Sequence, residues 1–190
     1  MKKHNILFVG ASTSRGGYVA QRLIDAGHKV YRIGKGGPDY NIDLTRAKTM
    51  ELREILKRAI LHCGVPIDTV VYNVRYETTR SLSAFDDRLM QEMVNLSVLV
   101  PLQLRRAWIN ASEPRKGELE NIPQFIVFGD HHDDEIGCSG LSDQLSEAVT
   151  RTNLNDGVVS KFYRLAPDSD REDMYNILDF TLTRLCSLDE

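Results

Sequence analysis

Asn5-Ile-Leu-Phe-Val-Gly10-Ala-Ser-Thr-Ser-Arg-Gly16-Gly17 is the stretch that decides the fold, because an apolar run leads there into a glycine-rich loop. Residues 5–9 form a short apolar run of the kind that makes a strand buried on both faces. A helical pattern over residues 18–26 follows the loop. Glycines permit a tight turn, and the amino end of a helix offers free N–H groups to a pyrophosphate. A tight strand–helix turn without a ligand has the same pattern, so the loop alone identifies no ligand.

Strand-like and helix-like segments alternate along the rest of the chain. Strands are predicted at residues 5–9, 29–33, 69–72, 125–128 and 158–165, and helices at residues 18–26, 47–61, 85–111 (interrupted near Pro101), 142–152 and 171–187. This alternation predicts an α/β fold, a Rossmann-like doubly wound parallel sheet of about six strands with helices on both faces. Ligands of such sheets bind outside the carboxyl ends of the strands, so a site is expected in the loops that follow them.

Composition limits the class of protein. The 190 residues are expected to form one domain, residues 1–190. A net charge of −3 argues against a general electrostatic nucleic-acid binder. No apolar run approaches the roughly 20 residues that span a bilayer, and the first apolar run is too short for a signal peptide. Three widely spaced cysteines give neither a disulfide framework nor a zinc pattern. We therefore expect a cytoplasmic protein with no membrane or nucleic-acid partner.

The glycine loop and several later motifs resemble those of the short-chain dehydrogenase/reductase family. Residues 9–16 stand where that family has Thr-Gly-x-x-x-Gly-x-Gly, with Gly10 and Gly16 kept and the middle glycine replaced by Ser14. Further similarity lies in residues 23–30, in residues 41–44 (the Asp-Leu/Val pair at adenine), in residues 71–75 (Asn-Asn-Ala-Gly), in residues 93–97 (the Asn-Leu stretch of the central helix) and in residues 164–167 (Arg-Pro-Gly). The resemblance implies a Rossmann fold that binds NAD or NADP.

The resemblance also implies which residues line a dinucleotide site. They are Gly10, Ser12, Ser14, Arg15, Gly16, Lys35, Asp43, Leu44 and Asn73. Family members that bind NAD place an acidic residue at the end of the second strand, where this chain has Gly34 and Lys35. Arg15 and Lys35 would together meet a 2′-phosphate, so NADP is favoured over NAD as the cofactor. The alternative is that both are solvated loop charges and that no cofactor binds.

The catalytic residues of the family are largely replaced. Its Tyr-x-x-x-Lys pair is matched by Ser139 and Asp143, and a serine hydroxyl has a far higher pKa than a phenol, which a carboxylate raises further. The position of the family's serine falls on Asp130 or His131, and only Asn95 remains of the usual four. The resemblance therefore implies a shortened, degenerate member in which ordinary carbonyl reduction is not expected.

An unusual loop, residues 129–135, carries two histidines and four carboxylates at the end of a predicted strand. Such side chains suit a divalent metal or acid–base work. Neighbours on one loop rarely point at one centre, so the interpretation we favour is a solvated acidic loop without a metal site.

Three hypotheses about function remain. The first is a dinucleotide-binding or regulatory protein without reductase activity. The second is an active NADP-dependent oxidoreductase in which Asn95, Asp130, His131 and Ser139 carry replaced chemistry. The third is a protein-interaction module with an empty cleft. The loss of the middle glycine favours it, because the bulkier Ser14 narrows the approach of a pyrophosphate. The resemblance further implies a homodimer that pairs through helices 85–111 and 142–152. The substrate, and whether the chain is an enzyme, stay open.

Overall fold

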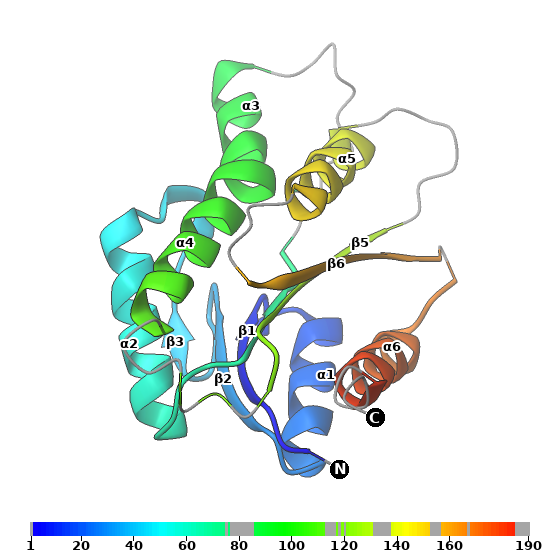
Figure 1. Cartoon of the computed structure of the whole chain (residues 1–190). Coiled ribbons are helices and arrows are strands. Elements are labelled where there is room, and N and C mark those ends of the chain that lie inside the picture. Colours follow the sequence, from blue (N-terminus) through cyan, green and yellow to red (C-terminus); the bar gives the residue numbers. More distant parts are fainter. Residues whose placement is uncertain are drawn as a thin grey trace.

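Six parallel strands form one sheet in the order β3-β2-β1-β4-β5-β6 (Figure 1). The structure is a computed structural model that describes residues 2–74, 76, 86–112, 117, 119, 121–130, 138–152, 157–166 and 168–184. The strands are β1 (Asn5–Val9), β2 (Lys29–Gly34), β3 (Tyr40–Asn41), β4 (Thr69–Tyr72), β5 (Gln124–Asp130) and β6 (Val159–Leu165). The order reverses direction between β1 and β4, as in a doubly wound sheet.

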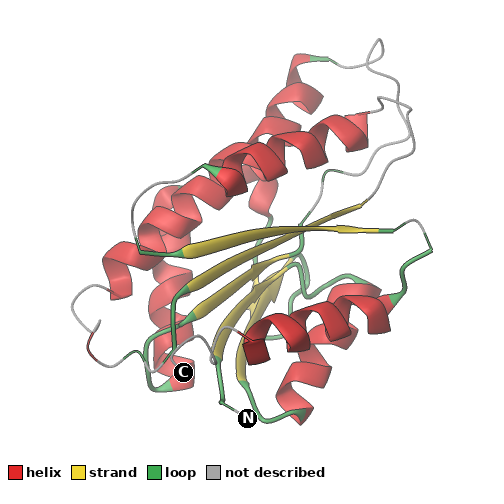
Figure 2. Ribbon diagram, turned by 45° about the vertical axis from the view of Figure 1, so that its right-hand side comes forward, coloured by secondary structure: helices red, strands yellow, loops and turns green. Residues whose placement is uncertain are grey.

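Helices cover both faces of the sheet (Figure 2). The helices are α1 (Ser14–Asp25), α2 (Thr49–Cys63), α3 (Asp87–Val94), α4 (Val100–Ser112), α5 (Cys138–Arg151) and α6 (Arg171–Arg184). Ile6 and Phe8 of β1 pack with α1 and α6, whereas Leu7 and Val9 pack with α2 and α4 on the other face. The predicted α/β fold is confirmed, as is the prediction that the first strand is buried on both faces. None of the described helices is long and apolar enough to cross a membrane.

The first helix begins earlier than its hydrophobic pattern predicted. It starts at Ser14 because the Thr13 hydroxyl accepts a hydrogen bond from the N–H of Gly16 at 2.9 Å, which caps the helix. The prediction from residue 18 was therefore wrong by one turn. Strand β3 and the 3₁₀ turn η1 (Leu44–Arg46) were not predicted, since two or three residues are too few to show a period.

The long helix expected over residues 85–111 is divided by one π-helical turn, η3 (Asn95–Leu99), which ends two residues before Pro101. Because proline has no N–H, the carbonyl of Ser97 cannot take its usual helical hydrogen bond. The Ser146 hydroxyl of α5 donates to that carbonyl at 3.4 Å, and the hydroxyls of Ser97 and Ser142 lie 2.6 Å apart. The irregular turn is thereby fixed against α5.

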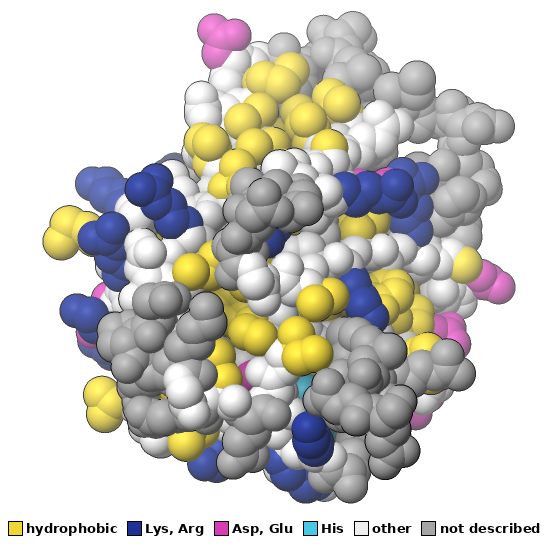
Figure 3. All heavy atoms as spheres, viewed as in Figure 1, with side chains coloured by type: hydrophobic (Ala, Val, Ile, Leu, Met, Phe, Trp, Pro, Cys, Tyr) yellow, Lys and Arg dark blue, Asp and Glu magenta, His cyan; other side chains and the backbone are white. Residues whose placement is uncertain are grey.

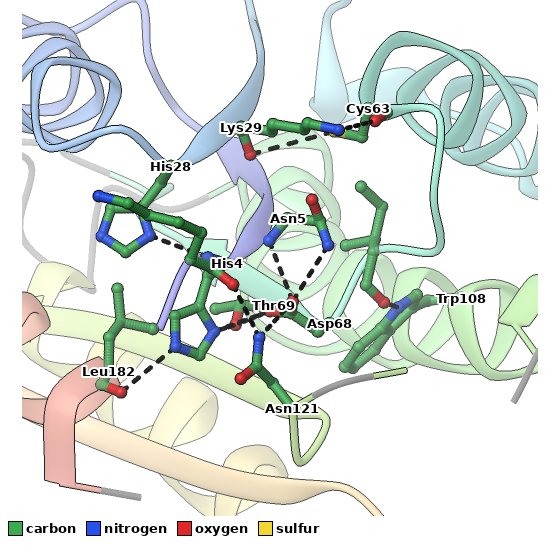
Figure 4. Close-up of polar contacts among 12 residues, drawn as sticks. His4, Asn5, His28, Lys29, Cys63, Asp68, Thr69, Trp108, Asn121 and Leu182 are labelled. Carbon is green, nitrogen blue, oxygen red and sulfur yellow. Dashed lines mark hydrogen bonds and ion pairs between the residues drawn. The ribbon is translucent and has the colours of Figure 1, made fainter. Parts of the chain in front are cut away.

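A buried polar cluster joins β1, β4 and α6 at the amino ends of the strands (Figure 4). The Asp68 carboxylate accepts from the N–H of Asn5 at 3.0 Å, from the Thr69 hydroxyl at 2.7 Å and from the Asn121 amide at 3.0 Å. The Nδ1 atom of His4 lies 2.9 Å from the same carboxylate, and its Nε2 lies 3.3 Å from a backbone carbonyl of α6. The cluster therefore lies at the amino ends of the strands, opposite their carboxyl ends.

His28 beside this cluster makes folding sensitive to acid. Its ring is 4% exposed, its Nδ1 accepts from the N–H of His4 at 3.0 Å, and its Nε2 has no hydrogen-bond partner in the described part of the chain. Burial, and then the nearby charges of His4 and Lys3, lower the pKa of His28 from 6.5 to about 4. The unfolded chain therefore takes up this proton first as the pH falls, and the folded state loses stability between pH 6.5 and 4.

We expect His28→Asn to remove this part of the acid sensitivity, because the amide oxygen can replace Nδ1 as the acceptor and does not titrate. A shift of this size corresponds to about 3 kcal/mol. Urea unfolding of both proteins at pH 7 and pH 4 measures it, and titrating carboxylates affect both proteins alike. A difference in stability between the two proteins that is the same at both pH values would contradict the role of His28.

Candidate functional site

A cavity of about 450 Å³ lies at the carboxyl ends of β1, β2 and β4. Four loops and one helical turn line it: residues between 10 and 15 after β1, residues 34–35 ending β2, residues 42–45 after β3, residues 73–74 after β4, and Leu96 of η3. Eight of the nine residues expected at a dinucleotide site line this cavity, and the ninth, Gly16, packs against Gly10 and Asn73. The side chains of the described residues therefore leave this cleft open.

Two glycines bring the walls of the cavity into backbone contact. Gly10 has φ +93°, and a Cβ there would lie 2.2 Å from the backbone oxygen of Asn73. A Cβ at Gly16 would lie 2.2 Å from the Gly10 oxygen and 3.0 Å from the Asn73 side-chain nitrogen. The first turn of α1 thus rests directly on the ends of β1 and β4, where no larger residue fits. Ser14, which replaces the middle glycine, is exposed on the first turn of α1.

Asn73 lines the cavity and has an unpaired side-chain acceptor. The residue is 4% exposed, and its backbone N–H donates to the carbonyl of Val9 at 2.9 Å. Its buried Oδ1 has no hydrogen-bond partner in the structure as described. Buried polar atoms are nearly always paired, so an unpaired one in a residue that lines a cavity is a candidate acceptor for a bound ligand or an ordered water.

Two cations and one anion are among the described residues that line the cavity. Lys35 is exposed at the end of β2, and Arg15 donates from Nη2 to the backbone oxygen of Ser169 at 3.3 Å. The Asp43 carboxylate accepts from the N–H of Thr45 at 3.1 Å and from its hydroxyl at 2.7 Å. These hydrogen bonds, assisted by the charge of Lys35, lower the pKa of Asp43. Asp43 therefore shapes the η1 turn as a carboxylate.

The residues expected to be catalytic are only partly described. Asn95 lies in η3, where its Nδ2 donates to the Thr45 carbonyl at 3.1 Å and its Oδ1 accepts from Gln91 at 2.9 Å. It joins η3 to the wall of the cavity instead of facing it. His131 and the side chains of Asp130 and Ser139 lie outside the described residues, as does the acidic loop 131–135. Their assignment to acid–base chemistry stays a prediction.

The position that the resemblance gives to the family's lysine is a buried carboxylate. Asp143 of α5 is 5% exposed, and its Oδ1 is 3.0 Å from the point where a Cβ on Gly129 would lie. That same Cβ would be 2.5 Å from Phe162 of β6. Helix α5 therefore packs tightly on the end of β5, with its acidic side chain turned inward.

Comparison with solved structures gives the fold. A NADH-dependent reductase complexed with NAD superposes with a TM-score of 0.75 at 17% identity, over 95% of this chain and 89% of that one. An alcohol dehydrogenase from Comamonas testosteroni specific for bulky-bulky ketones gives 0.75 at 15% identity, over 95% and 83%. A metagenomic short-chain oxidoreductase in complex with NADP gives 0.69 at 14% identity, over 97% and 94%. The fold is that of the short-chain dehydrogenases.

The likeness to that family is carried by structure and not by overall sequence. No protein-family model matches the chain, and no curated protein sequence is similar to it. The resemblance inferred from the motifs is confirmed at the level of the fold. The predicted set lacked six lining residues: Thr13, Gly34, Ile42, Thr45, Val74 and Leu96. Each of the six adjoins a residue or turn that the sequence analysis singled out, and that proximity was the signal available.

Proposed function

We propose that this chain binds a nicotinamide adenine dinucleotide in the cavity, prefers NADP to NAD, and acts as a binding or regulatory protein without ordinary carbonyl-reductase activity. The observation that carries the proposal is the position of the cavity. It lies where the strand order reverses between β1 and β4, and such switch points are where open α/β sheets bind their ligands.

The described residues fit such a ligand. The amino end of α1 and the close backbone at Gly10 suit a pyrophosphate. Ile42 and Leu44 are buried apolar residues on the wall and suit the face of adenine, while the orphaned Oδ1 of Asn73 suits a donor such as a ribose hydroxyl. Lys35 lies at the end of β2, the place that determines recognition of the ribose 2′ position. When bound, a nicotinamide group supplies hydride exchange.

The absence of reductase activity is proposed from the residues that replace the family's pair. A phenol can pass a proton to a carbonyl when a neighbouring cation lowers its pKa. The sequence offers Ser139 in place of the phenol and Asp143, which is buried and acidic, in place of the cation. This substitution reverses the charge that the chemistry needs.

A cytoplasmic location and a homodimer stay predictions. For the dimer, the supporting feature is apolar exposure on the surface formed by α3 and η3, where Met90 and Leu99 are each 40% exposed. Figure 3 shows apolar side chains gathered on the upper part of this face, over α3.

Binding of NADP is expected to raise thermal stability and to be measurable by calorimetry. Ligand at ~100 times its dissociation constant stabilises a fold by about 2.7 kcal/mol. We expect Lys35→Glu to weaken NADP binding at least about tenfold, because a carboxylate repels the 2′-phosphate, and to leave NAD binding unchanged or stronger, because a carboxylate at this place can accept from the ribose 2′-hydroxyl.

Lys57→Glu is the matched control, since Lys57 is exposed on α2 and does not line the cavity. No thermal shift with any of NADP, NADPH, NAD and NADH would refute the proposed function. Equal weakening of NADP and NAD by Lys35→Glu would refute the role of Lys35 at the 2′-phosphate.

A further inference from the structure

Helix α2 buries one side and exposes the other. The buried side chains, which pack in the core with β1, β2 and α4, are Leu52, Ile55, Leu56, Ala59 and Cys63. On the exposed side lie Met50 and Leu61, each of which is 80% exposed. Among the described residues, no other large apolar side chain is more than 55% exposed. Packing within the fold therefore does not account for either side chain.

Met50 and Leu61 lie along one line of the helix surface. They are eleven residues apart, which is close to three turns, so they project in nearly the same direction about 16 Å apart. Arg53, Glu54 and Lys57 lie between them on the same exposed side. A flat surface laid along α2 would therefore contact both apolar side chains at once.

Positive charge gathers around this line. Residues 44–63, which form η1 and α2, carry five Arg or Lys and two Glu, whereas the whole chain has a net charge of −3. Both glutamates are engaged locally, since Glu51 accepts from the backbone N–H of Lys48 at 2.9 Å and Glu54 from Nε of Arg58 at 3.1 Å. Within the described part of the chain, no ion pair involves the other cations, which are Arg46, Lys48, Arg53 and Lys57. Figure 3 shows Lys and Arg side chains on the left-hand flank, over α2, with apolar side chains projecting beside them.

We infer that the exposed side of α2 docks on an anionic lipid surface. Met50 and Leu61 enter the headgroup region, and the four cations face the lipid phosphates. The inference concerns binding at the surface of a bilayer and not a spanning segment. The expectation of no membrane partner was based on the lengths of apolar runs, which do not report on the charge of one helix side. The inference does not rest on the proposed function, since none of these side chains is in the described lining of the cavity.

A lipid surface fits this side of α2 better than a protein does. The side is a convex ridge, so a protein partner would need a matching groove, whereas lipid headgroups rearrange around a ridge. The long stems of Arg and Lys let their charged ends reach phosphates while the apolar side chains between them enter the bilayer interface. A second copy of the chain would bring two positive surfaces together, which opposes self-association through α2.

The test is cosedimentation of the whole chain with vesicles of phosphatidylcholine, prepared either alone or with about one third phosphatidylserine. We expect binding to the anionic vesicles and none to phosphatidylcholine alone. Binding should weaken as sodium chloride is added, because salt screens the attraction between exposed charges. Equal binding to both kinds of vesicle would overturn the inference, as would the absence of binding to the anionic vesicles at low salt.

Two variants of α2 test the residues. Arg53→Glu should weaken binding to anionic vesicles at least about tenfold, because it replaces a cation by an anion that also pairs with Lys57 one turn later. The double variant Met50→Gln, Leu61→Gln should weaken binding by a similar factor, because it removes the apolar side chains and keeps the charge. All three positions are exposed, so the variants are expected to fold, and urea unfolding checks this.

Matched controls lie elsewhere on the fold. Lys161→Glu on β6, at the opposite edge of the sheet, makes the same change in net charge as Arg53→Glu. Phe180→Gln removes a 55% exposed apolar side chain from α6, which packs on the other face of the sheet. Both should bind anionic vesicles like the unchanged protein. If either control weakens binding as much as its matched α2 variant, α2 is not the docking surface. Binding to polyglutamate without binding to anionic vesicles would overturn the inference in favour of an acidic polypeptide partner.

Discussion

Replacement of Gly10 by alanine is expected to lower the free energy of unfolding by about 4 kcal/mol. A backbone with φ +93° costs an L-residue about 1–2 kcal/mol, and the new methyl group would lie 2.2 Å from the oxygen and 2.8 Å from the carbon of the Asn73 carbonyl. Both are backbone atoms at the end of a fully buried strand, so relief requires strand displacement, and forced overpacking adds about 1–3 kcal/mol. Urea unfolding measures the loss.

Gly64→Ala is the control that separates the steric effect from the backbone effect. Gly64 ends α2 with φ +74° and has open space around it, so the same substitution there should cost only about 1 kcal/mol. If the two variants lose equal stability, the close approach of β1 to β4 at Asn73 is not what fixes this turn. We also expect Gly10→Ala to weaken NADP binding at temperatures where it stays folded, because any displacement of Asn73 moves a wall of the cavity.

The fold could be predicted from the sequence because its determinants are local. The apolar run of β1 and the apolar run of β4 each show a complete strand within a few neighbouring residues, and both were predicted with correct bounds. The start of α1 was missed because it depends on one hydroxyl, that of Thr13, and not on hydrophobic period. Strand β3 was missed because only two residues pair there.

The candidate site was predictable only through the resemblance to a family. Gly10 and Asn73 are far apart in sequence, and no periodicity relates them, yet their backbones touch across β1 and β4. The contact between the hydroxyls of Ser97 and Ser142 had no signal in the sequence, because it depends on the π-helical turn of η3. The sequence also contained no sign of the polar cluster around Asp68, because its members come from four segments that only the fold brings together.

Removal of the Asp68 carboxylate is expected to be the most damaging single change at the amino ends of the strands. Five hydrogen-bond contacts converge on its two oxygens, from His4, Thr69, Asn121 and both the backbone and the side chain of Asn5. Asp68→Ala removes the shared acceptor from a site that is 1% exposed, and each buried donor left without an acceptor costs about 1–3 kcal/mol. The Asn121 amide keeps a second acceptor, the carbonyl of Lys3 at 2.9 Å, so the loss comes from the remaining donors. We expect a loss of at least about 4 kcal/mol in urea unfolding at pH 7.

Two further variants show whether the loss comes from the orphaned donors. Thr69→Val removes a single donor to Asp68 and should cost only about 1 kcal/mol, whereas Asp68→Asn keeps one acceptor oxygen and should give an intermediate loss. If Asp68→Ala lowers the free energy of unfolding no more than Thr69→Val does, the cluster does not stabilise the fold. Because the cluster and the cavity lie at opposite ends of the strands, Asp68→Asn should bind NADP with unchanged affinity wherever it is folded. The amino ends of the strands would then contribute to the stability of the fold, and the carboxyl ends to ligand binding.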